Sequence, residues 1–153
     1  MERMAEKESY LSPVSKKLVE MIEKDAKNLA SAYLQEVKKH PNLPTYHSLP
    51  EKEVYERAYQ VYSQLERWIS YELESEKMRE HWIELGRQRR LEGFSLPEIF
   101  LSLCLERKQL WNKIQAEGLL DNALDLYQAL ELYNRIVTFF DRALYYAIIG
   151  YYS

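Results

Sequence analysis

The sequence predicts an all-α protein of five long helices. Apolar residues recur every three or four positions along five segments, and no segment shows the alternation of a half-buried strand. Only four glycines and five prolines occur in 153 residues, well below ordinary usage, so little of the chain is available for turns. Serine-proline signals also stand where the apolar stripes begin. We therefore expect one helical domain over residues 12–153, with residues 1–11 as a frayed N-terminus.

The first helix is expected over residues 13–39. Ser12 is in the position of an N-cap, and Pro13 suits the first turn, where a backbone N–H has no helical partner. Pro41 ends this helix, because a proline disfavours helical backbone at the preceding residue. Pro44 then keeps the linker extended.

The second and third helices are expected over residues 50–73 and 76–92. The second follows the motif Ser-Leu-Pro-Glu, in which Ser48 would be the N-cap and the carboxylate lies near the positive end of the helix dipole. Gly93 follows the third helix as its C′ residue. A glycine inside a helix costs about 1 kcal/mol relative to alanine, so Gly86 indicates a close backbone approach.

The fourth helix is expected to end at Glu117, and the fifth helix is expected over residues 122–149. The fourth begins at Ser95, in a second Ser-Leu-Pro-Glu motif that forms a capping box, and Gly118 ends it. Asp121 is in a position to cap the fifth helix. Each of the five segments thus has a residue that starts or stops a helix at one end at least.

Composition excludes several classes of function. The net charge is −3 and the isoelectric point is about 5.7, which is unlike a general nucleic-acid binder. The single cysteine, Cys104, rules out an internal disulfide framework and is expected to be buried. The first residues are charged, unlike a signal peptide, and the longest apolar run, residues 143–152, is about half of the ~20 that span a membrane. We expect a cytoplasmic protein that binds neither nucleic acid nor membrane.

Motifs for catalysis are absent from the sequence. No glycine precedes Gly86, so the first half has no phosphate-binding loop. His40, His47 and His81 do not stand in a nucleophile motif, and His81 follows Met78 at the spacing where a di-iron bundle needs glutamate. We therefore expect no enzymatic activity and no bound metal.

Two arginines interrupt apolar stripes. The stripe of Trp82 and Leu85 extends to Arg89 on the third helix, and Arg107 has a similar place on the fourth. A buried guanidinium needs an anion or carbonyl partners. Two interpretations remain open: each arginine pairs with a carboxylate such as Asp141, or one of them receives an anionic group inside the bundle.

Aromatic residues are more abundant than a small core needs, with thirteen tyrosines and three tryptophans. The fifth helix is apolar on several sides, and a widened apolar face is typical of self-association. We expect a homodimer formed through this C-terminal helix, with an interface of Ile136, Phe139, Leu144, Tyr145, Ile148 and Tyr152.

Several motifs lie in the order found in one regulatory family: Leu49-Pro50-Glu51, Leu85-Gly86-Arg87 followed by Gly93-Phe94-Ser95-Leu96, a leucine-rich fourth helix through Arg107 and Trp111, and Phe139-Phe140-Asp141-Arg142. Over most of residues 15–152 the chain resembles the N-terminal domain of RsbT co-antagonist proteins, the RsbR-type stressosome regulators, which also precedes some bacterial histidine kinases. The resemblance implies a dimeric, globin-like bundle of five to six helices that senses a signal and acts on a kinase or an anti-sigma-antagonist type of protein.

The resemblance also bears on haem. Haem-binding globin sensors resemble this region but carry Gly-x-x-His, whereas this chain has Gly86-Arg87-Gln88-Arg89. Arginine keeps its proton and does not ligate iron, so we expect no haem cofactor. An alternative function is a stand-alone binding protein for a small apolar or fatty-acid-like ligand, with an arginine at the acid group. The pocket candidates are His81, Trp82, Arg89, Phe100, Leu103, Arg107, Trp111 and Phe140.

Overall fold

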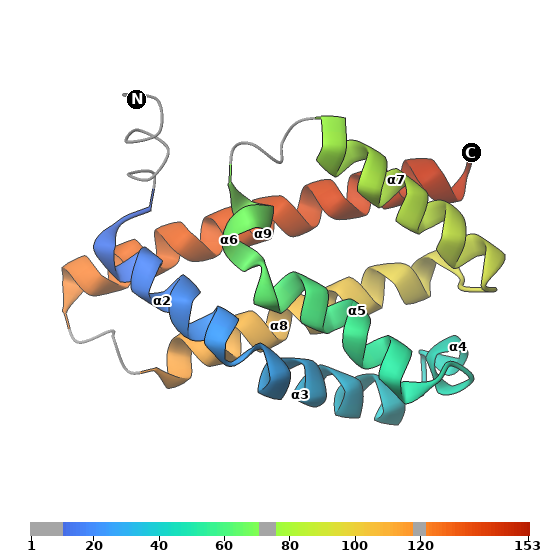
Figure 1. Cartoon of the computed structure of the whole chain (residues 1–153), viewed down its shortest axis with the longest axis horizontal. Helices are drawn as coiled ribbons and strands as arrows, with labels where there is room; N and C mark the ends of the chain where they lie inside the picture. Colours follow the sequence, from blue (N-terminus) through green and yellow to red (C-terminus); the bar gives the residue numbers. More distant parts are fainter. Residues whose placement is uncertain (1–10, 71–75, 118–121) are drawn as a thin grey trace.

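The described part of the chain is all-α, as predicted. The computed structural model describes residues 11–70, 76–117 and 122–153, and no strand occurs in these ranges. The part of the chain predicted to be a frayed N-terminus lies outside them, apart from Leu11, which is buried. The helices of Figure 1 are α2 (Pro13–Lys24), α3 (Ala26–Lys39), α4 (Pro44–His47), α5 (Glu51–Ser63), α6 (Leu65–Ile69), α7 (Glu76–Leu91), α8 (Leu96–Ala116) and α9 (Ala123–Tyr151).

Most of the predicted helix ends are confirmed. The Ser12 side chain accepts a hydrogen bond from the Ser15 backbone N–H at the start of α2. At α8, Ser95 and Glu98 each accept from the other's backbone N–H, which is a complete capping box. Gly93 has a φ of 94°, the left-handed conformation that glycine adopts after a helix. Asn122, rather than the predicted Asp121, caps α9; Asp121 lies outside the described residues.

Two predicted long helices are each divided in the structure. The first breaks at Asp25, where φ is −97° and ψ is 14°. Its carboxylate accepts a hydrogen bond from Asn28 and pairs with Lys113 of α8. The second breaks at Gln64, where φ is −125° and ψ is 32°. Both apolar stripes continue across the breaks, so a periodic pattern does not reveal them.

The predictions for Ser48 and for the extended linker are wrong. The linker contains the short helix α4, and Ser48 ends it by donating a hydrogen bond to the Thr45 carbonyl. Glu98 of α8 accepts hydrogen bonds from the Thr45 backbone and side chain at 3.0 and 2.9 Å. Burial alone would raise the pKa of Glu98, but these bonds and those from Ser95 outweigh it and lower the pKa. A contact from distant α8 therefore stabilises this turn.

The predicted close approach at Gly86 is confirmed. In Figure 1, α7 lies beside the C-terminal half of α9. A Cβ atom added at Gly86 would overlap the backbone carbonyl of Ala147, and one added at Gly150 would overlap that of Ile83. Arg90 also donates a hydrogen bond of 2.7 Å to the Tyr151 carbonyl near the end of α9. The two helices therefore pack backbone against backbone, and little room is left between them.

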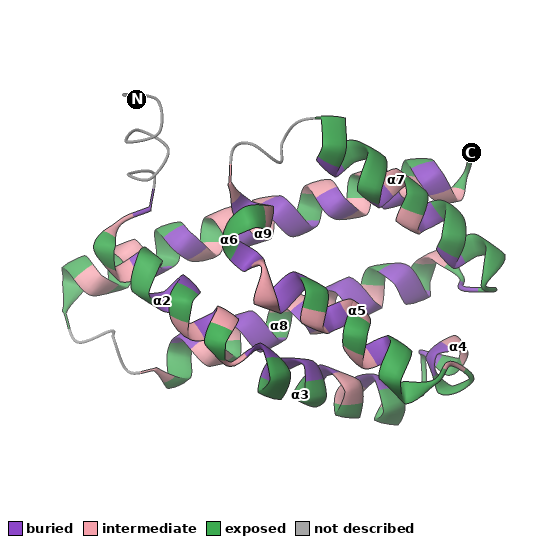
Figure 2. Cartoon of the chain, in the orientation of Figure 1, coloured by how far each residue is buried: buried purple, intermediate pink, exposed green. Residues whose placement is uncertain are grey.

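The core lies between all of these helices, and Figure 2 shows the buried residues on their inward faces. This burial corrects part of the predicted dimer interface. Ile136 and Phe139 belong to the core of the chain itself and are closed to a partner. Leu144 and Ile148 are half-buried, whereas Tyr145 and Tyr152 are exposed. Cys104, expected to be buried, is only half-buried.

No helix in the described ranges combines the length and the apolar character that a membrane crossing requires.

Candidate ligand-binding groove

A groove of about 860 Å³ lies between α5 and α7. From α5 it is lined by Glu53, Arg57, Gln60 and Val61, and from α6 by Trp68. From α7 and the residue after it come Lys77, Glu80, His81, Trp82, Glu84, Leu85, Gln88, Arg89 and Glu92. The spacing of the α7 residues is that of one helix face, opposite the face that packs on α9 through Gly86.

A smaller recess of about 50 Å³ continues the groove toward α8. Groove and recess share Arg57, Val61, Trp82, Leu85 and Arg89. The recess adds buried side chains from three other helices, namely Tyr33, Tyr46, Ser102, Leu103 and Glu106 among others. The whole site therefore has an open outer part, lined by charged and aromatic side chains, and a buried inner end that contains the carboxyl group of Glu106.

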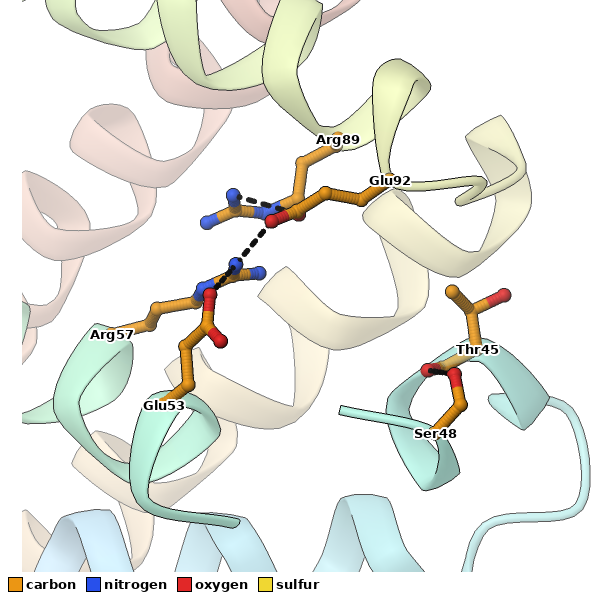
Figure 3. Close-up of polar contacts among 6 residues, drawn as sticks. All are labelled: Thr45, Ser48, Glu53, Arg57, Arg89 and Glu92. Carbon is orange, nitrogen blue, oxygen red and sulfur yellow. Dashed lines mark hydrogen bonds and ion pairs between the residues drawn. The ribbon is translucent and has the colours of Figure 1, made fainter. Parts of the chain in front are cut away.

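Four charged residues form a chain of ion pairs between α5 and the end of α7, and the two arginines among them line both groove and recess. Arg57 of α5 contacts Glu53 and Glu92, both at 2.6 Å, and Glu92 also pairs with Arg89 of α7 at 3.3 Å. Figure 3 shows the guanidinium groups of Arg57 and Arg89 both in contact with the Glu92 carboxylate. Burial and the positive charge of Arg57 lower the pKa of Arg89, and its side chain nevertheless remains a cation.

Three buried N–H groups at this groove have no hydrogen-bond partner within the described residues. They are Arg57 Nη1, Trp68 Nε1 and Trp82 Nε1, and all three residues line the groove. A buried donor without a partner costs about 1–3 kcal/mol. All three groups are donors, so a bound molecule would satisfy them by bringing acceptor atoms.

The outer part of the groove has an aromatic wall. The Trp68 ring lies 5.0 Å from His81 and 5.6 Å from Trp82, and the rings of His81 and Trp82 are 5.1 Å apart. Partial burial and the nearby charge of Arg89 lower the pKa of His81, so this ring is neutral at pH 7 and above. Such a wall suits an apolar or flat organic molecule.

At the inner end stands Glu106 of α8, only 6% exposed. Burial raises its pKa to about 8, although the charge of Arg89 opposes the rise. Its backbone carbonyl accepts a hydrogen bond from the Tyr62 hydroxyl at 2.7 Å. Its carboxyl group makes no hydrogen bond or ion pair within the described residues, and at neutral pH it is mostly protonated.

The structure brings four predicted pocket residues together. His81, Trp82 and Arg89 line the groove, and Trp82, Arg89 and Leu103 line the recess. The interpretation that Arg89 pairs with a carboxylate is confirmed, because Arg89 contacts Glu92.

The other four candidates lie elsewhere. Phe100 is on the outer face of α8 and is 53% exposed. Arg107 pairs with Asp141 at 3.8 Å, and Asp141 is the carboxylate that the sequence analysis named as a possible partner. Trp111 packs on Tyr133 and Phe140 packs on Phe139, so each fills the space around α9 rather than the groove.

Sequence reasoning missed Arg57 and Glu106. A signal for Glu106 exists, because it stands three residues after Leu103 and four before Leu110 and so belongs to the buried stripe of α8. Its neighbour Arg107 is turned by about 100° on the helix, toward the surface. Arg57 lies beside the buried stripe of α5, and only its contacts with α7 distinguish it from a surface arginine.

No protein-family model, no curated protein and no solved structure matches this chain.

Proposed function

We propose that this chain is a non-catalytic sensory domain that binds a small organic molecule between α5 and α7 and transmits its presence to a signalling protein. The observation that carries the proposal is the set of three unpaired buried donors on a single groove, next to a buried arginine. The resemblance to RsbR-type N-terminal domains supports the regulatory role, a haem-free globin-like arrangement, and a kinase or anti-sigma-antagonist type of partner.

The route to a partner follows from the two faces of α7. One face lines the groove, and the other packs on α9 at Gly86 and Gly150. Arg90 and Tyr151 tie the last turn of α7 to the last turn of α9, since the Tyr151 hydroxyl also donates to the Phe94 carbonyl at 2.9 Å. A ligand that favours one position of α7 would therefore shift the end of α9.

Native mass spectrometry of gently purified protein tests the binding function. We expect a bound small molecule in the wild-type chain and its loss in Leu85→Trp, because Leu85 lines both groove and recess and an indole there would obstruct the region where the two join. The matched control is Leu101→Trp on α8, a half-buried leucine that lines neither. An adduct retained equally by both variants would place the molecule outside the groove. If wild-type protein carries no adduct and binds neither octanoate nor octanamide, the proposed function is wrong.

A second candidate function is assembly through the C-terminal helix. In the first turns of α9, Leu124 and Tyr127 are 62% and 64% exposed, and Leu130 on the same side is also exposed. Large apolar side chains at a spacing of three residues form a stripe that a partner helix can cover. This stripe lies at the opposite end of α9 from the exposed Tyr145 and Tyr152.

Sedimentation equilibrium tests this assembly. We expect a wild-type dimer, and we expect Leu130→Glu to weaken it at least tenfold, because a carboxylate inside an apolar interface loses its hydration. The control is Tyr145→Glu, which makes an exposed position toward the other end of α9 acidic. A wild-type monomer at high micromolar concentration would contradict the dimer, and dissociation by Tyr145→Glu alone would move the interface to the C-terminal end.

A further inference from the structure

Two cations, Arg57 and Arg89, and one acid, Glu106, line the inner recess, and no ion pair joins Glu106 to either arginine. Arg89 and Glu106 both line the recess, and they are 9% and 6% exposed. They make no ion pair with each other, because Arg89 turns to Glu92. Beside them stands Trp82, whose Nε1–H is buried and unpaired. The recess thus holds a buried positive charge, an unpaired donor and an acid whose carboxyl group has no hydrogen bond in the described residues.

We propose that this recess is the anion site of the groove, that it takes the carboxylate of an organic acid, and that the anion enters only when Glu106 is protonated. The inference rests on the proposed function, since it assigns the chemistry and the regulation of the same site. Protonated Glu106 can donate a hydrogen bond to the bound carboxylate. Ionised Glu106 instead competes with that carboxylate for the positive charge of Arg89.

The charges around the recess support one anion at a time. Arg57 and Arg89 are balanced by Glu53 and Glu92, which contact them. Ionised Glu106 therefore already gives this region a net negative charge, and a second anion would add to it inside a poorly solvated space. With a proton on Glu106, the bound carboxylate is the single additional charge.

Other titratable groups near Glu106 keep their charge state through the relevant range. Tyr33 of α3, Tyr46 of α4 and Tyr62 of α5 all face it, and burial raises the pKa of each above the ordinary value for tyrosine. Glu36 of α3 also acts on Tyr62. The arginines Arg57 and Arg89 stay cationic. Among the described residues that line the recess, Glu106 is thus the group that changes charge between roughly pH 7.5 and 9.5.

The affinity for an anion is expected to fall as the pH rises, because Glu106 loses its proton. Binding of an anion favours the protonated form of Glu106, so the site takes up a proton whenever Glu106 was ionised beforehand. Because the pKa of Glu106 is about 8, the protonated fraction falls about 25-fold between roughly pH 7.5 and 9.5. The dissociation constant of an anionic ligand should rise by the same factor.

Octanoate is the probe, and octanamide is its neutral counterpart of the same length. Isothermal titration calorimetry is carried out at several values of pH, in two buffers with different ionisation enthalpies, which counts the protons taken up. We expect the dissociation constant of octanoate to rise about 25-fold over this range, with nearly one proton taken up at the alkaline end. For octanamide we expect no pH dependence.

Two variants complete the test. Glu106→Gln keeps a neutral donor in the recess, and we expect it to bind octanoate with an affinity that does not change with pH. Glu36→Gln removes the other carboxylate near Tyr62 and leaves Glu106 in place, so its pH dependence should match that of wild type. If Glu106→Gln does not fold, the number of protons that the wild-type chain takes up on binding octanoate tests the proposal instead.

The failures are distinguishable. Equal, pH-independent binding of octanoate and octanamide, or a slope retained in Glu106→Gln, overturns the proton-linked anion site and leaves the groove as a ligand site. If octanamide binds and octanoate does not, the anion site is likewise overturned and the groove remains a ligand site. Binding of neither probe overturns this inference and, together with a wild-type chain that carries no adduct, the proposed function as well.

Discussion

Replacing Gly86 with alanine is expected to lower the free energy of unfolding by about 3 kcal/mol, as overpacking of a rigid contact does. The new Cβ would overlap the backbone carbonyl of Ala147, and a backbone atom cannot move aside as a side chain can. The loss exceeds the gain of about 1 kcal/mol that alanine brings to a helix interior. Urea denaturation followed by far-ultraviolet circular dichroism measures the difference.

Two other substitutions separate this contact from the general cost of changing a glycine or a helix surface. Gly93→Ala has free space around its Cβ but a φ of 94°, so it should cost only about 1 kcal/mol. Arg79→Ala on the exposed side of α7 should stay within about 0.5 kcal/mol of wild type. A Gly86→Ala variant as stable as Arg79→Ala would mean that α7 and α9 can separate without loss.

Glu106→Gln is expected to stabilise the chain at neutral pH. A pKa raised from 4.5 to about 8 means that the folded state holds a proton that the unfolded state has already lost. The stability contributed by Glu106 is therefore greatest in acid, falls as the pH rises above 4.5, and reaches its minimum near pH 8. Relative to the variant, wild type should lose on the order of 3 kcal/mol between pH 4.5 and pH 7.

Denaturation midpoints of both chains at a series of pH values test this, because other titrating groups are common to both. Glu98→Gln is the opposite control. Hydrogen bonds to Glu98 overcome the effect of its burial and lower its pKa, so its stabilising contribution is present at neutral pH and lost in acid. Glu98→Gln should therefore be destabilised at pH 7. A constant difference between wild type and Glu106→Gln at all pH values would show that Glu106 is not a buried acid.

About half of the candidate site could be predicted from the sequence. Arg89 could be predicted because a cation at an apolar position of a helical pattern can be recognised in the sequence. His81 and Trp82 lie on the same helix face. Arg57 could not be found in this way, because its importance comes from Glu92, 35 residues further along the chain. Glu106 was overlooked beside Arg107, where a difference of one residue separates the core from the surface.

The sequence alone determined the all-α class, the capping box at Ser95, the left-handed turn at Gly93 and the close approach at Gly86, because each of these depends on a few residues near one another. Tertiary structure decided the break at Asp25 and the turn at Ser48. It also placed unpaired donors, a buried cation and a buried acid around one hollow. These features arise where helices distant in sequence meet, and hydrogen bonding and burial there are properties of the contact rather than of either segment.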